Sequence, residues 1–243
     1  TRKRTLFPYT TLFRSPMHPL KSPLALLAPL AMLLAACNSV RVAPEGQLPK
    51  ALVQPMKAHV GLVLDDELRA FKHEETRSSA EWAVDLGPGH EQLLKAVFGA
   101  SFSTVEVFRN FDEARAATGL QGVFSPRIEQ YSFATARETG GTYWAVTIRY
   151  RIGVFTPQGE PADSLTLTGY GSAGDAGRAA PSLVNATRAA MRDAAAKLLV
   201  QMPRQPVAQK LVAGEILRAG ESTVMVDPIE TVPIEAVATP PAG

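Results

Sequence analysis

The stretch Tyr143–Phe155, which reads YWAVTIRYRIGVF, decides the fold class, because apolar side chains recur in it at every second position. Thr147, Arg149 and Arg151 occupy the positions between them. A period of two is that of a strand with one buried face and one wet face, which is typical of antiparallel sheets. The predicted inner face comprises Trp144, Val146, Ile148, Tyr150, Ile152 and Val154.

Shorter patterns on both sides of this stretch predict the rest of the sheet. The turn residues Pro157-Gln158-Gly159-Glu160 lead into the alternating Leu165–Tyr170, which predicts a hairpin. Pro126 cannot donate a ladder hydrogen bond, so its strand is predicted to be an edge strand or to break there. The other predicted strands of the sheet cover 60–64, 104–108 and 122–133, and the last of these contains Pro126.

Two amphipathic segments predict helices. Leu93, Leu94, Val97 and Phe98 form one apolar stripe, and a longer stripe runs from about Pro181 to Met202. The predicted order is therefore β-α-β-β-β-β-α. We expect an α+β fold with a largely antiparallel sheet of about four to five strands, two helices packed on one face, and flexible N- and C-terminal tails.

The segment before the chain's only cysteine reads as an export signal. Lys21 is followed by the apolar stretch 24–34 and by Leu33-Leu34-Ala35-Ala36-Cys37. A membrane-spanning helix needs about 20 predominantly apolar residues, and this run is shorter and contains Pro23 and Pro29. A basic start, a short apolar core and small residues at its end are typical of a cleaved secretory signal.

Leu34-Ala35-Ala36-Cys37 resembles the lipobox of bacterial lipoproteins. The resemblance implies cleavage between Ala36 and Cys37, diacylation of the Cys37 thiol, and acylation of the new amino terminus, with palmitate as a typical acyl group. Membrane lipid is then the first expected partner. Lipoproteins with Asp after the cysteine tend to stay in the inner membrane, so Asn38 implies the periplasmic face of the outer membrane.

Composition divides the chain into five expected parts: 1–16 as translated sequencing adapter, 17–36 as signal peptide, 37–57 as a tether, 58–203 as the α/β domain, and 204–243 as a mostly disordered Pro, Val and Ala-rich tail. Within this tail, a short helix is expected from Val207 to Arg218. Removing residues 1–36 takes away five basic residues and moves the formal charge from +2 to −3. The charge balance therefore gives no support for nucleic acid as a partner, and the alternative of an N-terminal basic arm is set aside.

The motifs that suggest chemistry have simpler interpretations. Residues 169–174 match G-x-G-x-x-G, yet Asp175–Ala180 separate them from the next helix, so a strand-exit loop is preferred to a dinucleotide site. His73-Glu74-Glu75 and Asp65-Asp66-Glu67 are interpreted as solvated charged loops, since no pair of histidines has zinc-helix spacing. His90 has no nucleophile pattern beside it. We expect no enzymatic activity, no cofactor and no metal site.

The chain combines the lipobox and the order of elements with the Leu86-Gly87-Pro88 helix entry and the Thr168-Gly169-Tyr170-Gly171 stretch. In these features it resembles the small periplasmic α/β lipoproteins typified by YajG. A broader group of similar layout includes LptE, LpoB and the periplasmic part of CsgG. This resemblance implies an assembly or accessory protein without catalysis. We expect it to dock on an envelope protein, through an exposed sheet edge or the C-terminal tail. The alternative is an envelope lipid- or glycan-binding module that uses Arg127, Arg149 and Arg151 on the wet sheet face.

Overall fold

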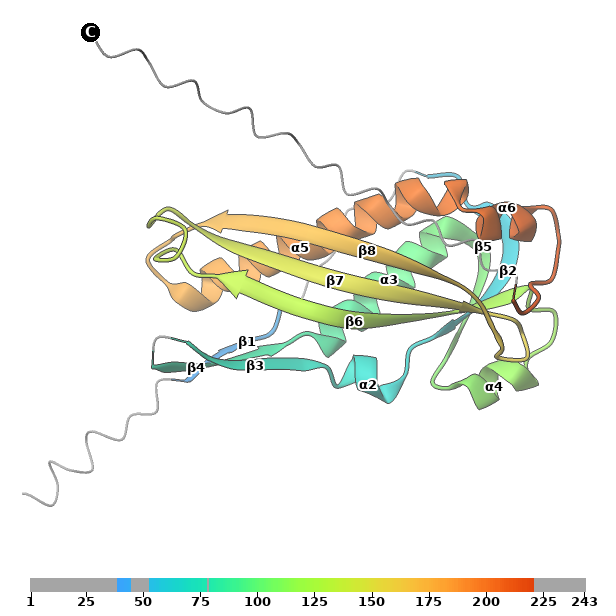
Figure 1. Ribbon diagram of the computed structural model, residues 1–243, viewed down its shortest axis with the longest axis horizontal. Helices are drawn as coiled ribbons and strands as arrows, with labels where there is room; N and C mark the ends of the chain where they lie inside the picture. The colour runs from blue at the N-terminus through green and yellow to red at the C-terminus, as the bar shows by residue number, and fades with distance from the viewer. Residues whose placement is uncertain (1–38, 45–52, 78, 221–243) are drawn as a thin grey trace, which may run out of the picture. The chain divides into compact units, whose positions relative to one another are not determined.

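The computed structural model describes residues 39–44, 53–77 and 79–220 (Figure 1). Cys37 and the predicted signal segment lie outside these residues. The elements follow in the order β1 (Ser39–Val42), β2 (Met56–Val63), α2 (Asp66–Arg69), β3 (Lys72–Arg77), β4 (Ala80–Asp85), α3 (Gly87–Ser101), β5 (Phe102–Phe108), α4 (Phe111–Ala116), β6 (Gly122–Ala134), β7 (Tyr143–Phe155), β8 (Pro161–Gly174), α5 (Ala179–Gln201), a 3-10 turn (Met202–Arg204) and α6 (Pro206–Val212).

The main sheet has five strands in the order β5-β2-β6-β7-β8. β6, β7 and β8 form the antiparallel series expected from the hairpin signals, with Tyr150 opposite both Ile128 and Leu167. β2, however, is parallel to β5 and to β6. The α+β class is confirmed, but a largely antiparallel sheet is wrong for this half, because α3 before β5 and α4 before β6 return the chain to the same end of the sheet.

A second sheet of three strands, in the order β1-β4-β3, was not predicted from the sequence. β1 is parallel to β4, and β3 is antiparallel to β4. Val42 in β1 is buried, and Val40 packs against the same core. The prediction that 37–57 is a tether is therefore wrong for 39–42 and for the start of β2 at Met56, since these residues hydrogen-bond within sheets.

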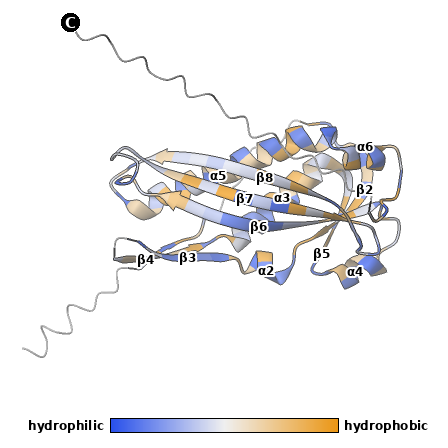
Figure 2. Cartoon of the chain, in the orientation of Figure 1, coloured by the Kyte–Doolittle hydropathy of each residue, from blue (hydrophilic) through white to orange (hydrophobic). Residues whose placement is uncertain are grey.

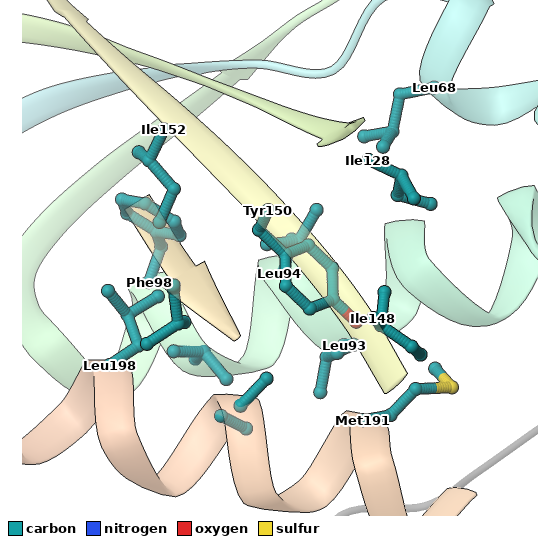
Figure 3. Packing of buried hydrophobic residues seen from close by; sticks show 14 of the residues in the cluster. Leu68, Leu93, Leu94, Phe98, Ile128, Ile148, Tyr150, Ile152, Met191 and Leu198 are labelled. Atoms are coloured by element: carbon teal, nitrogen blue, oxygen red, sulfur yellow. The ribbon is translucent and has the colours of Figure 1, made fainter. Parts of the chain in front are cut away.

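The core lies between β7 and the helices α3 and α5, and Figure 3 shows its packing. Ile148, Tyr150 and Ile152 of β7 point toward Leu94 of α3 and Leu198 of α5 in this view. All five side chains are buried. The alternation of β7 therefore does what the sequence predicts, since every second residue from Trp144 to Val154 is buried. Figure 2 shows apolar and polar residues following one another along the strand.

The close approach of α5 to β8 depends on two glycines. A Cβ atom at Gly169 would lie 2.2 Å from the Ala190 carbonyl oxygen, and one at Gly171 would lie 2.2 Å from the Ala186 oxygen and the Ala190 nitrogen. Both glycines belong to β8, which continues to Gly174. The predicted strand-exit loop at 169–174 is thus wrong: the glycines lie within a strand and allow a helix to pack directly on it.

Residues after Arg204 also belong to the folded domain. Val207, Ala208, Leu211 and Leu217 are buried in the main core. Gln121 fixes this segment, because its Nε2 donates to the Leu211 oxygen over 2.8 Å and its own backbone oxygen accepts from Leu217 N over 2.8 Å. The predicted disordered tail from 204 is therefore wrong up to Gly220, whereas 221–243 lie outside the described residues.

Among the described residues, no helix has the length and apolar character needed to cross a membrane.

Candidate functional site

The three predicted binding arginines lie on the exposed face of β6 and β7. Arg127 stands directly opposite Arg151 in the β6–β7 ladder, and Arg149 stands opposite Thr168 of β8. All three side chains are exposed because the alternation of β7 puts Ile148, Tyr150 and Ile152 on the other face. We call Arg127, Arg149 and Arg151 the arginine face.

A β-bulge in β6 adjusts the charge of this face. The register shifts between Ile128 and Gln130, so Glu129 is the extra residue. Its Oε1 lies 2.6 Å from Arg151 Nε, which neutralises one of two cations that oppose each other across the strands. Within 39–44, 53–77 and 79–220, Arg127 and Arg149 have no carboxylate within ion-pair distance. The arginine face therefore offers two free guanidinium groups to an anionic partner.

Two cavities in the described part of the chain are small and lie away from this face. One, of about 20 Å³, is lined by residues around α6 and β8, including Asp163, Lys210 and Arg218. The other, of about 10 Å³, is an apolar space among Leu94, Tyr150 and Leu198 between α3, β7 and α5. Pockets for drug-sized ligands occupy about 300–1,000 Å³, so each of these spaces holds little more than one water molecule.

His90 lies in the core and hydrogen-bonds through both ring nitrogens. Its Nδ1 donates to the Leu86 oxygen over 2.7 Å, which leaves Nε2 to accept from the Tyr150 hydroxyl over 2.7 Å. Burial lowers the pKa of His90 to about 4, against a smaller raising effect of the Leu86 hydrogen bond. Burial also raises the pKa of the Tyr150 phenol well above its usual range. Both groups are therefore neutral near pH 7 and link α3 to β7.

The segment His73-Glu74-Glu75 is part of β3, so its interpretation as a loop is wrong. The His73 ring lies at a tilt to that of Tyr131, with the ring centres 5.0 Å apart, and its Nε2 lies 3.2 Å from Glu75 Oε2. Asp65 is likewise a helix cap and not a loop residue, since its Oδ1 accepts from Leu68 N over 2.9 Å at the start of α2. In the described part of the chain, no group of His, Cys, Asp and Glu side chains is placed to hold a metal ion.

An aromatic cluster between the two sheets was missed by sequence reasoning. The Trp82 ring centre lies 5.3 Å from that of Phe133 and 5.5 Å from that of Trp144. Arg77 covers the cluster, with its guanidinium carbon 4.6 Å from the centre of the Phe133 ring. The sequence signal that could have predicted the strand carrying Trp82 is the alternation of Ala80, Trp82 and Val84, which is typical of a short strand.

The edge of β8, one of the docking sites predicted from the resemblance, is capped by α5. Asp193 Oδ2 accepts from Tyr170 N over 2.8 Å, and Lys197 Nζ donates to the Thr168 oxygen over 3.0 Å. Asp193 and Lys197 are themselves 2.7 Å apart. We call this pair the edge clamp. It occupies backbone groups that a partner strand would use at this point.

Comparisons with known proteins give remote similarity only. No family of proteins matches the sequence, and no curated relative is found. A Xanthomonas campestris protein of the DUF330 family is 12% identical, has a TM-score of 0.40, and is matched over 72% of this chain and 93% of that chain. A Caulobacter crescentus protein, provisionally assigned as a lipoprotein, is 11% identical with a TM-score of 0.29, over 43% of this chain and 79% of that chain. At these values neither structure supplies a function for this chain.

Proposed function

We propose that the chain is a non-enzymatic bacterial lipoprotein, held in the membrane by acyl groups on Cys37, that acts as an accessory or docking protein of the cell envelope. The observation that carries the proposal is the run Leu33-Leu34-Ala35-Ala36-Cys37 at the end of a short apolar segment. The domain that follows supports it, because His59, His73 and His90 hydrogen-bond to neighbouring groups and the two cavities described above are too small for a substrate.

The anchor is tested by replacing Cys37 with Ser. We expect C37S to lose incorporation of radiolabelled palmitate and to leave the membrane fraction. The matched control is Ser39→Ala, two residues away, which keeps both the thiol and the membrane association. A C37S protein that stays membrane-bound in high salt contradicts a lipid anchor.

Within this proposal the protein lies at the periplasmic face of the outer membrane. Asn38 supports that location through its place after Cys37. Sucrose-gradient fractionation of the unchanged chain tests it directly, and Asn38→Asp is the informative variant, since we expect it to shift the protein toward the inner membrane. Recovery of the unchanged chain with the inner membrane contradicts the proposed location.

The partner in the proposal is an envelope protein with an acidic surface. Arg127 and Arg149 support an acidic partner surface, because both side chains are exposed and lack a carboxylate partner among the described residues. We expect the double variant R127A/R149A to lose a stoichiometric partner that co-purifies from membranes with the unchanged chain. R192A/R204A is the control, since it removes the same charge from exposed positions on α5 and the following turn.

Binding of an anionic envelope lipid or glycan is the second candidate, favoured by the same unpaired guanidinium groups. It predicts that purified protein binds phosphatidylglycerol vesicles or an acidic polysaccharide without any protein partner, and that R127A/R149A weakens this binding more than R192A/R204A does. Equal binding by the two double variants rejects this candidate.

A further inference from the structure

The folded domain begins almost at the predicted site of acylation. β1 starts at Ser39, where Ser39 is the register partner of Glu81 in β4. Val42, at the end of the same strand, is buried with 5% of its surface exposed. The chain is therefore held in a sheet from Ser39, the second residue after Cys37, to Val42.

Covalent geometry then limits how far the domain can lie from Cys37. Two residues span at most about 7 Å, whatever their conformation. A flexible tether of about 20 residues would instead give a root-mean-square separation of about 25 Å. The short connection therefore keeps Ser39, and the surface around it, near the anchor.

Hydrogen bonds show which loops share that surface. Arg77, at the tip of the β3–β4 hairpin beside β1, donates to the Phe133 oxygen over 2.7 Å and to Glu138 over 2.8 Å. This joins the hairpin to the β6–β7 loop. Asp175 N donates to the Thr142 oxygen over 3.1 Å, which joins the exit of β8 to the same loop. We call Ser39, Arg77, the loop 135–142 and the residues 175–178 the anchor end.

The charges of the anchor end suit a phospholipid surface. Arg77 and Glu138 are paired with each other, and hydrogen bonds from Thr135, followed by those from Arg77, keep the Glu138 pKa below its usual value. Arg137 and Arg178 are both exposed, and neither has a carboxylate within ion-pair distance in the described part of the chain. Guanidinium groups bind phosphate oxygens well, often through two hydrogen bonds.

We propose that the anchor end faces the membrane and rests on phospholipid headgroups through Arg137 and Arg178. This inference depends on the proposed acylation of Cys37. β7 contains 13 residues and leads away from the anchor end, so the β7–β8 turn at Gln158 is about 40 Å from the headgroups. The arginine face, near the middle of β6 and β7, is then held off the membrane and open to a partner.

A quenching experiment on the acylated full chain tests this orientation. Cys37 is the chain's only cysteine, and its sulfur is blocked once acylated, so a single introduced cysteine is the only free thiol. Thr142→Cys marks the anchor end, and Gln158→Cys marks the opposite turn; both positions are exposed. Each variant carries an environment-sensitive fluorophore in vesicles of phosphatidylethanolamine and phosphatidylglycerol that contain a headgroup spin label.

We expect several-fold stronger quenching at position 142 than at position 158. R137A/R178A should reduce this ratio without releasing the protein from the vesicles. Inserting a flexible Gly and Ser linker of about 20 residues between Asn38 and Ser39 should make quenching at the two positions equal.

Two other outcomes overturn the proposal. Strong quenching at both positions means that the domain lies flat on the membrane, and equally weak quenching means that it stands clear of the headgroups. In either case the chain remains acylated and bound, so the lipid anchor survives and only the orientation fails. A chain that carries no acyl group and stays in solution contradicts the anchor, and the orientation fails with it.

Discussion

At the scale of single residues, the buried pair His90 and Tyr150 makes stability depend on pH. His90 is fully buried, and burial lowers its pKa to about 4, whereas its ordinary value is 6.5. Between these values the unfolded chain binds a proton that the folded chain does not bind. Stability from this group is therefore complete above about pH 6.5 and falls as the pH decreases toward 4.

We expect this group to cost roughly 3 kcal/mol of unfolding free energy between pH 7 and pH 4. Urea unfolding at several pH values measures the effect. His90→Gln keeps a polar group at the site but cannot titrate, so its stability should depend less on pH across this window. An unchanged pH dependence in H90Q contradicts the assignment of the effect to His90.

A second residue-scale prediction concerns the glycines of β8. Gly171→Ala places a methyl group 2.2 Å from backbone atoms of α5, so the helix must shift. We expect a loss of roughly 1–3 kcal/mol in unfolding free energy, which is the usual cost of overpacking. Gly174→Ala is the matched control, because a Cβ atom there meets nothing within 4 Å. Similar losses in the two variants contradict the packing role of Gly171.

At the scale of elements, α5 protects the open edge of β8. The edge clamp bonds the two backbone groups at Thr168 and Tyr170, and Lys197 Nζ also lies 4.7 Å from the centre of the Tyr170 ring. Edge strands with free backbone groups pair with other chains, and charged side chains are a common way to prevent this. α5 therefore covers one face of the sheet and also blocks part of its edge.

Asp193→Ala should expose the Tyr170 N–H and increase self-association, measured by light scattering and sedimentation at increasing protein concentration. Asp193→Asn keeps an oxygen that accepts from Tyr170 N, so we expect it to remain as monodisperse as the unchanged chain. If D193A and D193N associate to the same extent, the edge clamp does not prevent self-association.

At the scale of the whole molecule, the segment from Gln205 to Gly220 closes the core beside β2 and the start of β6, since α6 packs against β2 and Leu217 lies against Gly122. Leu211 and Ala208 are fully buried, and a Cβ atom at Gly122 would lie 2.5 Å from a methyl carbon of Leu217. This segment contributes four buried apolar side chains to the core: Val207, Ala208, Leu211 and Leu217.

We expect a chain that ends at Arg204 to be less stable than one that ends at Gly220 by at least about 3 kcal/mol, since several buried apolar side chains are lost. Urea unfolding of the two truncated chains measures the difference, and the m-value should also fall in the shorter one if less surface is buried. Equal midpoints mean that α6 adds nothing to the core.

Local sequence was sufficient for the elements whose pattern repeats over many residues. The alternation of Tyr143–Phe155 predicts both the buried face of β7 and the exposure of Arg149 and Arg151, and it is confirmed by the burial of every second residue. The stripe of α5 predicts a helix, and the helix runs from Ala179 to Gln201. The position of Arg127 opposite Arg151 needed the structure, because a register across two strands with a bulge is not visible in either strand alone.

Tertiary structure decided β1 and β3, the strands that place the anchor end near Cys37. β1 has four residues and β3 reads KHEETR, so neither has a local hydrophobic period that separates it from a loop. Their stability comes from hydrogen bonds to β4 and from the burial of Val42, which exist only once distant segments meet. The sequence by itself determined the motif at Cys37, and the fold determined that a strand follows it within two residues.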